Sequence, residues 1–428
     1  MSDRDKEQDF FAYKKCRSYK ILFQNNRCAD FSTYTEEAYH IKEIGSLVMK
    51  EYHVKDVSWQ KQSFPQRAAW IEYTESQSRW FDEQGKTIVS LAHQAYEILE
   101  QIVEYLKSRH VISNIQFMFD DTLKVFCKSN NFFPSQKQIN YYCIVQMSTE
   151  TKGKLSKRVF TCGQSDGKLN ELIALKEQIH EYVEENWLKE EQKTLAEFQP
   201  GIFDIVMSPE IAALFMHEAI GHLLEADNFA SSDLNLKVGE QIGANILNVI
   251  DNPTLEGLSG SALYDDEGEM TREKYLIRKG RIEQLLANKE YEGKFPNTTR
   301  GNARAKDCTS ELLIRMSNTY IEPGIKDIQP EIEKMEHVIY LDELLGGNTN
   351  QNLFYIAAGK ITELQNGKMV REYKGRTIIF SILETVKNIC FIGDKLVWFN
   401  GGLCGKKNQN LSVSMGSPHI MIKNIEVK

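Results

Sequence analysis

The chain of 428 residues lacks any uninterrupted apolar stretch near the ~18–20 residues that a membrane-spanning helix needs. It has no basic run either, and 52 Lys plus Arg against 60 Asp plus Glu give a net charge of −8, which does not favour binding to nucleic-acid phosphates. The charged N-terminal segment contains no apolar run of the kind found in secretory signals. We therefore expect a cytoplasmic protein with neither a membrane nor a nucleic acid among its partners.

Cysteine is sparse, and no two cysteines form a Cys-x-x-Cys pair. The eight are Cys16, Cys28, Cys127, Cys143, Cys162, Cys308, Cys390 and Cys404. Such thin spacing argues against a disulfide framework and against a zinc ribbon. We expect reduced thiols, most of them acting as small buried hydrophobic side chains.

The rest of the composition is that of an ordinary globular protein, with 41 % apolar and 26 % charged residues. A Phe-Gln-Pro-Gly break at residues 198–201 predicts a boundary between domains 1–197 and 198–428. We predict an α+β fold in which an N-terminal α+β domain precedes a β-rich, mainly antiparallel C-terminal domain.

Local patterns predict individual elements in both domains. Apolar spacing indicates helices over residues 88–106 and from residue 169 to about 196. Alternation predicts a strand hairpin around Asp120-Asp121 and a pair of strands joined through Lys152-Gly153-Lys154. In the second domain, strands are predicted over residues 202–207, 337–341, 376–383 and 419–427, with hairpin turns at Lys279-Gly280 and Asn366-Gly367.

The strongest chemical signal is the segment His217-Glu218-Ala219-Ile220-Gly221-His222, in a chain with only nine histidines. Neutral imidazoles bind zinc well, and a carboxylate next to the first histidine can accept a proton from a zinc-activated water molecule. The segment lies in a helix predicted to start at Ser208-Pro209-Glu210, which offers a hydroxyl cap, a first-turn proline and an acid. The alternative is an amphipathic helix whose two histidines are ordinary polar residues.

The two histidines are five residues apart, which is about 140° around a regular helix of 3.6 residues per turn. Side chains at that angle cannot converge on one ion, so the helix must bend, widen or end between them. Gly221 is the residue best suited to permit this. Catalytic zinc normally has three protein ligands. The candidates for the third are Glu225, Asp227, a distant carboxylate, His419 and a cysteine, among which Cys404 lies between glycines on an expected loop.

Several blocks together resemble the TldD/PmbA family of metallopeptidases. In order along the chain they are LFMHEAIGHLLEAD, SGSALYDDEGEMTREKYLIRKGRI, TTRGNARA, IRMSNTYIEPG, LDELLGGNTNQNLFYIAAGKI and GGLCGKKNQNLSVSMGSPHIMI. They run from about residue 195 to residue 428, whereas the segment before them matches only in general organisation.

The resemblance implies that His217, His222 and Cys404 bind one zinc ion per chain and that Glu218 is the catalytic base. Since all four positions are intact, it implies the active, TldD-like subunit and not the metal-free companion of the family. It also implies a peptidase for unstructured or extended peptides, including modified precursor peptides. A homodimer, or a heterodimer with a metal-free paralogue, is implied too, with the N-terminal domain contributing to substrate cavity and dimerisation.

Five residues are candidates for substrate binding, each with a structural alternative. Asn318 and Thr319 lie in a predicted strand that either pairs through its backbone with an extended peptide or is an ordinary sheet strand. Asp265 and Asp266 either position a loop by hydrogen bonds or form a polar turn. Asn348, which follows two glycines, is expected to line the cleft.

The alternative class of function is a peptide-binding or maturation scaffold with a structural or silent zinc. A structural zinc would have a fourth protein ligand, whereas an intact Glu218 favours an enzyme because a structural site needs no base. A hydrolase of non-peptide amides is the third possibility.

Overall fold

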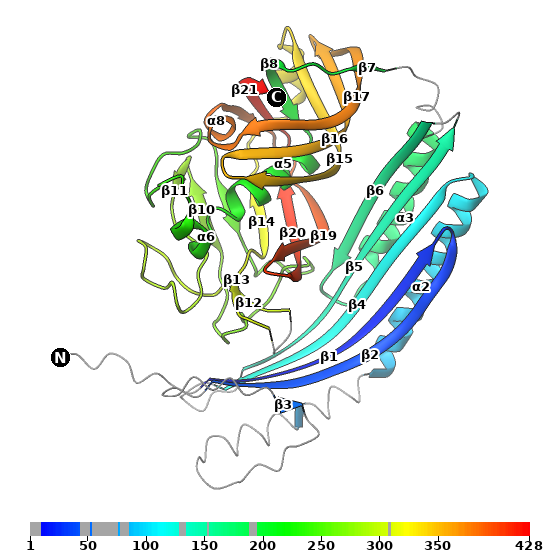
Figure 1. The fold of residues 1–428 in the computed structure, drawn as a ribbon, viewed down its shortest axis with the longest axis vertical. Coiled ribbons are helices and arrows are strands. Elements are labelled where there is room, and N and C mark those ends of the chain that lie inside the picture. Colours follow the sequence, from blue (N-terminus) through cyan, green and yellow to red (C-terminus); the bar gives the residue numbers. More distant parts are fainter. Residues whose placement is uncertain are drawn as a thin grey trace, which may run out of the picture.

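The computed structural model of the chain describes residues 10–42, 52–53, 76–77, 85–127, 134–151, 154–187, 195–306 and 310–428. A six-stranded sheet is formed by strands from the N-terminal part of the chain. Strands from the C-terminal part form a six-stranded sheet, a seven-stranded sheet and a two-stranded ribbon. Figure 1 shows these two regions beside each other, with the N-terminal helices on the side of their sheet that faces away from the C-terminal region. Among the described residues, no helix is both long enough and apolar enough to cross a membrane.

The N-terminal sheet is antiparallel throughout its described pairs and has the order β3-β2-β1-β4-β5-β6. The strands are β1 (Phe10–Gln24), β2 (Arg27–Lys42), β3 (Tyr52–His53), β4 (Ile112–Cys127), β5 (Ser135–Thr151) and β6 (Lys154–Gln164). Alternate residues of β4, namely Ile115, Phe117 and Phe119, are buried in one core with the apolar faces of the helices. This period of two gives the sheet one face covered by helices.

The hairpin predicted at Asp120-Asp121 is wrong, because β4 continues through both residues. Asp120 pairs with Ser18 on one side and with Asn140 on the other, in unbroken register. The buried carboxylate of Asp121 lies 3.6 Å from Lys137 Nζ on β5. A cation on the neighbouring strand lets an acid remain inside the sheet, so the acidic pair does not mark a turn. The strands expected on either side of Lys152 are present as β5 and β6.

Both long helices are present, with one change of length. Helix α2 (Gly85–Ser108) includes the predicted segment, and α3 (Asn170–Tyr182) ends in a π-helical turn, η2 (Val183–Trp187). Residues 188–194 of the second predicted helix lie outside the described residues, and its predicted end at residue 196 is wrong. Ala196 and Glu197 form β7, a strand that pairs with β17.

The C-terminal region is built from two sheets. Their orders are β18-β21-β8-β15-β16-β17-β7 and β11-β10-β9-β14-β20-β19, and β12 pairs with β13. The strands are β8 (Gly201–Met207), β9 (Val249–Asp251), β10 (Lys274–Arg278), β11 (Arg281–Ile282), β12 (Ala303–Arg304), β13 (Leu313–Ile314), β14 (Asn318–Ile321), β15 (Val338–Asn350), β16 (Leu353–Gln365), β17 (Lys368–Ser381), β18 (Ile389–Ile392), β19 (Val397–Lys406), β20 (Gln409–Ser417) and β21 (Ile420–Val427). The helices are α5 (Pro209–Met216), the π-helical η3 (His217–Gly221), α6 (Ala226–Ser231), α7 (Gln329–Glu333) and α8 (Ile382–Lys387).

Pairing in these sheets is mainly antiparallel, as predicted, with parallel pairs only at β8–β15, β14–β20 and β7–β17 among the described strands. Both predicted hairpin turns are present. Lys279 and Gly280 have φ of 48° and 74°, and Asn366 and Gly367 have φ of 48° and 76°. Positive φ at two successive residues is typical of the tight turn that matches the twist of two antiparallel strands. The strand predicted over residues 376–383 ends at Ser381, and α8 begins at the next residue.

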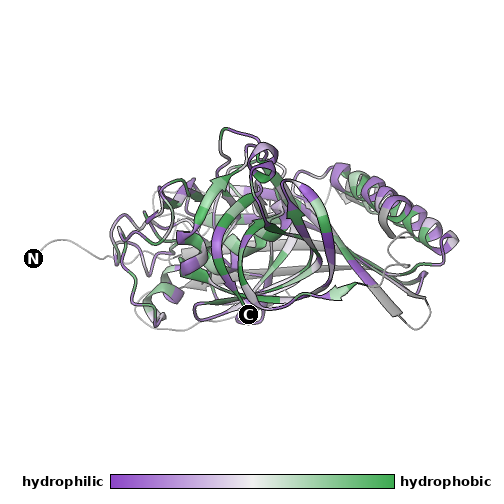
Figure 2. Ribbon diagram, turned by 90° about the horizontal axis from the view of Figure 1, so that it is seen from above, coloured by the Kyte–Doolittle hydropathy of each residue, from purple (hydrophilic) through white to green (hydrophobic). Residues whose placement is uncertain are grey.

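The segment α5–η3 lies between the two large sheets, where it contacts β15 and β16 of one sheet and β14, β19 and β20 of the other. Most of its apolar residues are consequently buried, among them Ile211, Phe215 and Ile220. Figure 2 shows hydrophobic residues concentrated on the strands and helix at the centre of this region. The helix with the His-Glu-x-x-x-His segment is therefore part of the principal core. The predicted boundary after residue 197 falls between β7 and β8 and stays a prediction.

Candidate metal centre

The helix that carries the two histidines is irregular where the sequence predicts a break. Its turn widens there from α-helical to π-helical. Helix α5 starts after Ser208 with Pro209 in its first turn, although the Ser208 hydroxyl makes no capping hydrogen bond. At His217 the helix changes to the π-helical η3, where the His222 N–H donates to the His217 carbonyl over 3.1 Å. This hydrogen bond spans five residues, as in a π-helix. It places the two histidines one wide turn apart and on the same side of the helix.

Gly221 serves a different purpose from the predicted one. Its φ is not in the left-handed region, so the widened turn does not depend on glycine's backbone freedom. A Cβ at this position would instead collide with the Met316 sulfur, from the segment that leads into β14. The missing side chain at Gly221 therefore allows the helix to pack closely against Met316.

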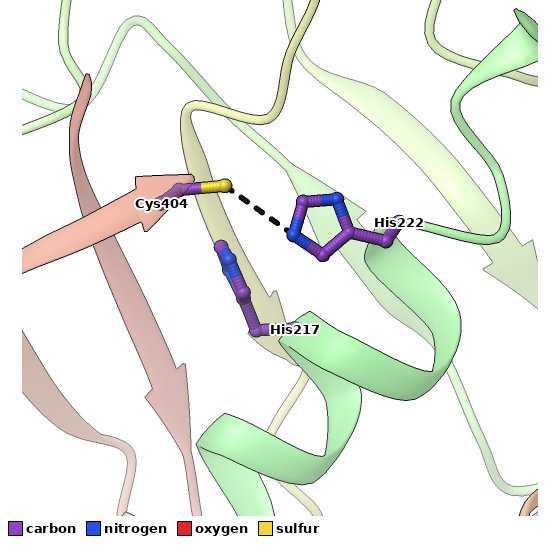
Figure 3. A group of neighbouring side chains, drawn as sticks. All are labelled: His217, His222 and Cys404. Atoms are coloured by element: carbon purple, nitrogen blue, oxygen red, sulfur yellow. Dashed lines mark hydrogen bonds between the residues drawn. The ribbon is translucent and has the colours of Figure 1, made fainter. Parts of the chain in front are cut away.

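Three side chains from distant parts of the chain converge at this turn. His217, His222 and Cys404 each present one ligand atom, and these atoms all lie within 4.8 Å of one another. Cys404 Sγ is 3.4 Å from His222 Nε2, and the two imidazole rings are at 82° with their centroids 5.2 Å apart. Figure 3 shows both histidines reaching from the helix towards the thiol on the facing strand.

Cys404 lies in a strand and not on the loop that its neighbouring glycines suggested. It belongs to β19, is 4 % exposed and forms part of the main core. Behind it, the fully buried Arg315 donates to the Cys404 carbonyl and, over 3.2 Å, to the Gln409 carbonyl on β20. The thiol is therefore held on a rigid hairpin.

The donor set and its hydrogen bonding fit a zinc ion. Two imidazoles and a thiolate are a ligand set that zinc accepts in proteins. Within the described part of the chain, His217 Nδ1 is buried and has no hydrogen-bond partner. A buried polar atom without a hydrogen-bond partner lowers the stability of the fold unless a ligand interacts with it. The cluster is therefore suited to a bound cation. The assignment of these three residues as metal ligands itself stays a prediction.

The electrostatics of the cluster favour ionised side chains. Burial raises the pKa of the Cys404 thiol, but the two neighbouring histidines outweigh it and lower that pKa to about 4. Burial lowers the pKa of His222, yet its contacts with Cys404 and Glu225 raise the pKa to about 11. The metal-free chain thus holds a thiolate beside an imidazolium, and metal binding would release the imidazolium proton.

Glu218 lies at the edge of the cluster. One of its carboxylate oxygens is 4.0 Å from His222 Nε2, and its side chain is 23 % exposed. Because it points towards the cluster and keeps access to solvent, it can exchange protons with a water molecule there. Its role as base stays a prediction.

The other candidates for a third ligand have different partners. Glu225 Oε2 is 3.2 Å from His222 Nδ1, on the far side of the ring from Cys404, and Asp227 binds Lys406. His419 Nε2 is 3.0 Å from the Tyr340 hydroxyl, in another part of the fold. We did not predict the contact between Glu225 and the His222 ring from the sequence. An acidic residue three positions after His222 was the signal that could have predicted it.

Asn318 and Thr319 lie inside the second sheet. Asn318 is fully buried and donates to the Asn252 carbonyl over 2.9 Å, while the Thr319 hydroxyl donates to Asp251 over 2.9 Å. Their strand, β14, is paired with β9 on one side and β20 on the other, so its backbone is not available to pair with a peptide. The structure does not bring these side chains to the candidate metal centre.

Asp265 and Asp266 position a loop by hydrogen bonds, which was one of the two alternatives. Asp265 is buried and accepts from the Glu267, Glu269 and Ala303 N–H groups at 2.9–3.1 Å. Burial raises the pKa of Asp265 to about 7. Asp266 forms an ion pair with Lys124 on β4 and therefore connects the two regions of the molecule. Asn348 is exposed on β15, where it faces solvent.

Comparisons with known proteins show what this chain is similar to. Residues 200–428, more than half of the chain, match the family model described as the PmbA/TldA metallopeptidase C-terminal domain. A metalloprotease of Methanothermobacter thermautotrophicus is 36 % identical over 231 residues, which are 53 % of this chain and 50 % of that protein. A zinc metalloprotease TldD homologue of Saccharolobus solfataricus is 32 % identical over 229 residues, 53 % of this chain and 52 % of that protein. The chain thus spans about half the length of the curated relatives it matches.

A solved structure extends the likeness to the whole chain. TldE from Thermococcus kodakarensis superposes with a TM-score of 0.66 at 14 % identity, covering 98 % of this chain and 96 % of that one. At such low identity the match concerns the fold alone, and it confirms the mixed α+β class.

Proposed function

The chain belongs to the PmbA/TldD metallopeptidase family, and from this premise we propose that it is a zinc-dependent peptidase that cleaves unstructured or extended peptides. We propose His217, His222 and Cys404 as the ligands of one zinc ion per chain. Glu218 is proposed as the general base.

The observation that carries the proposal is the convergence of two imidazoles and a thiolate to within 4.8 Å, next to a partly exposed carboxylate. The group comprises three ligands among the described residues, and catalytic zinc sites typically have three protein ligands and one open position. This count supports an enzyme over a scaffold with structural zinc, which would have a fourth protein ligand.

The chain's own residues have distinct parts in such a reaction. Zinc would supply Lewis acidity, which lowers the pKa of water and polarises a scissile carbonyl. Glu218 accepts the proton of the attacking water and passes it to the leaving amine. The two imidazoles and the buried thiolate hold the cation in place, and the widened turn η3 sets the separation of the two histidines.

Substrate, partner and location are proposed more broadly. We propose extended peptides, among them modified precursor peptides, as substrates, and a homodimer or a heterodimer with a metal-free paralogue as the working unit. A cytoplasmic location is supported, among the described residues, by the free thiols of Cys143, Cys162, Cys390 and Cys404.

The test is incubation of the purified, zinc-loaded protein, alone and with candidate partner chains, with a library of unstructured peptides. Mass spectrometry of the products gives the cleavage sites, and Glu218→Gln serves as the inactive control. Cleavage by the wild type and not by the variant supports the proposal. Zinc binding without any cleavage would favour the scaffold, and products containing only cleaved non-peptide amides would indicate a different hydrolase.

A further inference from the structure

The ring of His222 is contacted at both nitrogens, and both contacts lead to strand β19. His222 Nε2 lies 3.4 Å from Cys404 Sγ. On the other side, His222 Nδ1 lies 3.2 Å from Glu225 Oε2, and the same oxygen accepts a hydrogen bond from Lys406 Nζ over 2.9 Å. Cys404 and Lys406 are two residues apart on one strand, so their side chains project from the same face of β19.

The ammonium group of Lys406 is fully used in this position. It donates to Glu225 over 2.9 Å, to Asp227 over 2.8 Å and to the Ile314 carbonyl over 3.1 Å. An ammonium has three N–H donors, so each has an acceptor. The Lys406 side chain is 10 % exposed and that of Glu225 is fully buried. Buried charges are tolerated only when paired, so this ammonium and this carboxylate fix each other's position.

Asn228 completes the arrangement from the helix side. Its side-chain amide donates to Glu225 Oε2 and to the His222 carbonyl, both over 2.9 Å. The carboxylate of Glu225 is therefore held between the helix segment after η3 and strand β19. These two segments come from distant parts of the sequence, since His222 and Cys404 are 182 residues apart.

We propose that Lys406 is a positioning residue for the metal centre. Through Glu225 it fixes the orientation of the His222 ring, so that Nδ1 is engaged and Nε2 faces Cys404. It also ties β19 to the histidine helix, which keeps the thiol and the two imidazoles together before a metal binds. The inference rests on the proposed zinc site and adds to it a residue that does not touch the ion. Outer partners of this kind typically change metal affinity ~10–100-fold when they are removed.

The neighbouring Lys407 provides a matched control. It lies in the turn after β19, is exposed, and its ion pair is with Glu311, outside the cluster. Lys406→Met and Lys407→Met therefore remove the same charge one residue apart. Only the first of these changes removes a contact that leads to His222.

The test measures zinc affinity of the metal-free full chain by competition with a chromophoric chelator. Lys406→Met is expected to weaken binding ~10–100-fold, with Lys407→Met within about twofold of the wild type. Glu225→Gln, which preserves size, is expected to weaken binding in the same range and carries the test if Lys406→Met does not fold. Equal affinity of folded Lys406→Met or Glu225→Gln and the wild type would overturn the inference.

A spectroscopic readout separates positioning from general stability. Loaded with cobalt(II), Lys406→Met is expected to show shifted or weakened visible bands and Lys407→Met the wild-type spectrum, while Lys406→Arg restores part of the difference by restoring the charge. An unchanged Lys406→Met spectrum would overturn the inference. Cys404→Ser separates failure of the proposed zinc site from failure of the proposed role of Lys406. If Cys404→Ser binds zinc like the wild type, the proposed zinc site itself is wrong. If Cys404→Ser loses zinc affinity but Lys406→Met and Glu225→Gln do not, only the role of Lys406 is refuted.

Discussion

Two buried polar clusters of the C-terminal region differ in how many hydrogen bonds they leave unmade. In the Asp251 cluster (Asp251, Asn302, Ser317 and Thr319), the carboxylate accepts four hydrogen bonds of 2.8–3.2 Å. In the candidate metal centre (His217, His222 and Cys404), Cys404 Sγ lies 3.4 Å from His222 Nε2, and His217 Nδ1 has no hydrogen-bond partner in the described chain.

The comparison shows what distinguishes a structural polar cluster from a binding site in a core. The Asp251 cluster is closed, since its members form hydrogen bonds with one another. These hydrogen bonds hold β9, β14 and a loop together. The metal centre is open, since its three donor atoms lie within 4.8 Å of one another and one buried ring nitrogen of His217 has no hydrogen-bond partner in the described chain. Burial alone does not separate the two, because residues of both clusters are almost fully buried.

The largest expected effect in the open cluster is on the ionisation of Cys404. With a pKa of about 4 in place of 9.0, the thiol ionises about 10⁵-fold more readily than an ordinary one. The thiolate is then present at neutral pH and is lost as the pH falls through about 4. Ultraviolet absorbance of the metal-free protein, with Cys404→Ser subtracted, measures this directly. A midpoint near pH 9 would contradict the close approach of the two histidines.

The next effect is on turnover. Glu218→Gln keeps the shape of the side chain but removes its basicity, so peptide cleavage is expected to fall ~10²–10⁴-fold. Zinc content should be unchanged, because Glu218 is not among the three converging residues. Metal analysis beside a peptide-cleavage assay checks both. Full activity in the variant would remove Glu218 from the role of base.

Removing a ligand should weaken the site itself. Structural zinc sites bind with about 10–16 kcal/mol shared over four ligands, so losing one is expected to lower zinc affinity ~10²–10³-fold. We therefore expect Cys404→Ser to lose most of its bound metal in dialysis followed by elemental analysis. Cys143→Ser, a buried thiol in the N-terminal sheet, is the control and should keep its zinc. Retention of full zinc stoichiometry by Cys404→Ser would exclude Cys404 from the site.

A substitution in the Asp251 cluster should change the stability of the fold but not zinc binding. Thr319→Val keeps the side-chain shape and removes one hydrogen bond to a buried carboxylate, so the free energy of unfolding should fall by about 1.5–3 kcal/mol. Zinc affinity should not change. Urea denaturation and chelator competition measure the two quantities. A raised KM with unchanged stability would instead return Thr319 to the substrate cleft.

The smallest effect is expected at Asn348. Its side chain is exposed, so Asn348→Ala should change the free energy of unfolding by no more than about 0.5 kcal/mol. If the segment after Gly346 and Gly347 lines the cleft, KM for peptide rises a few-fold with kcat unchanged. Steady-state kinetics with one cleaved peptide decides this, and an unaltered KM would exclude Asn348 from substrate contact.

The sequence predicted the break in the histidine helix because it follows from local geometry. The spacing of five from His217 to His222 does not fit a regular α-helical turn, and the π-helical η3 resolves the mismatch by widening the turn. The two tight turns at Lys279 and Asn366 were predictable for the same reason, since positive φ at paired turn residues is a local requirement.

Contacts between distant segments could not be predicted from local patterns. Spacing left the third ligand open, and the resemblance to a family, not the residues themselves, pointed to Cys404. Lys137 on a neighbouring strand explains why the acidic pair at Asp120 is no turn, and nothing near Asp121 in sequence reveals it. Asn318 and Thr319 were predicted to bind substrate because they are polar and follow an apolar run. The sequence near them does not reveal that buried partners such as Asp251 accept their hydrogen bonds.

The most direct test of the central claim is an anomalous difference map measured at the zinc absorption edge from crystals of the zinc-loaded protein. We expect one peak per chain, about 2.0–2.1 Å from one ring nitrogen of each of His217 and His222 and about 2.3 Å from Cys404 Sγ. A map with no peak between these three side chains, or with the zinc bound elsewhere, would contradict it.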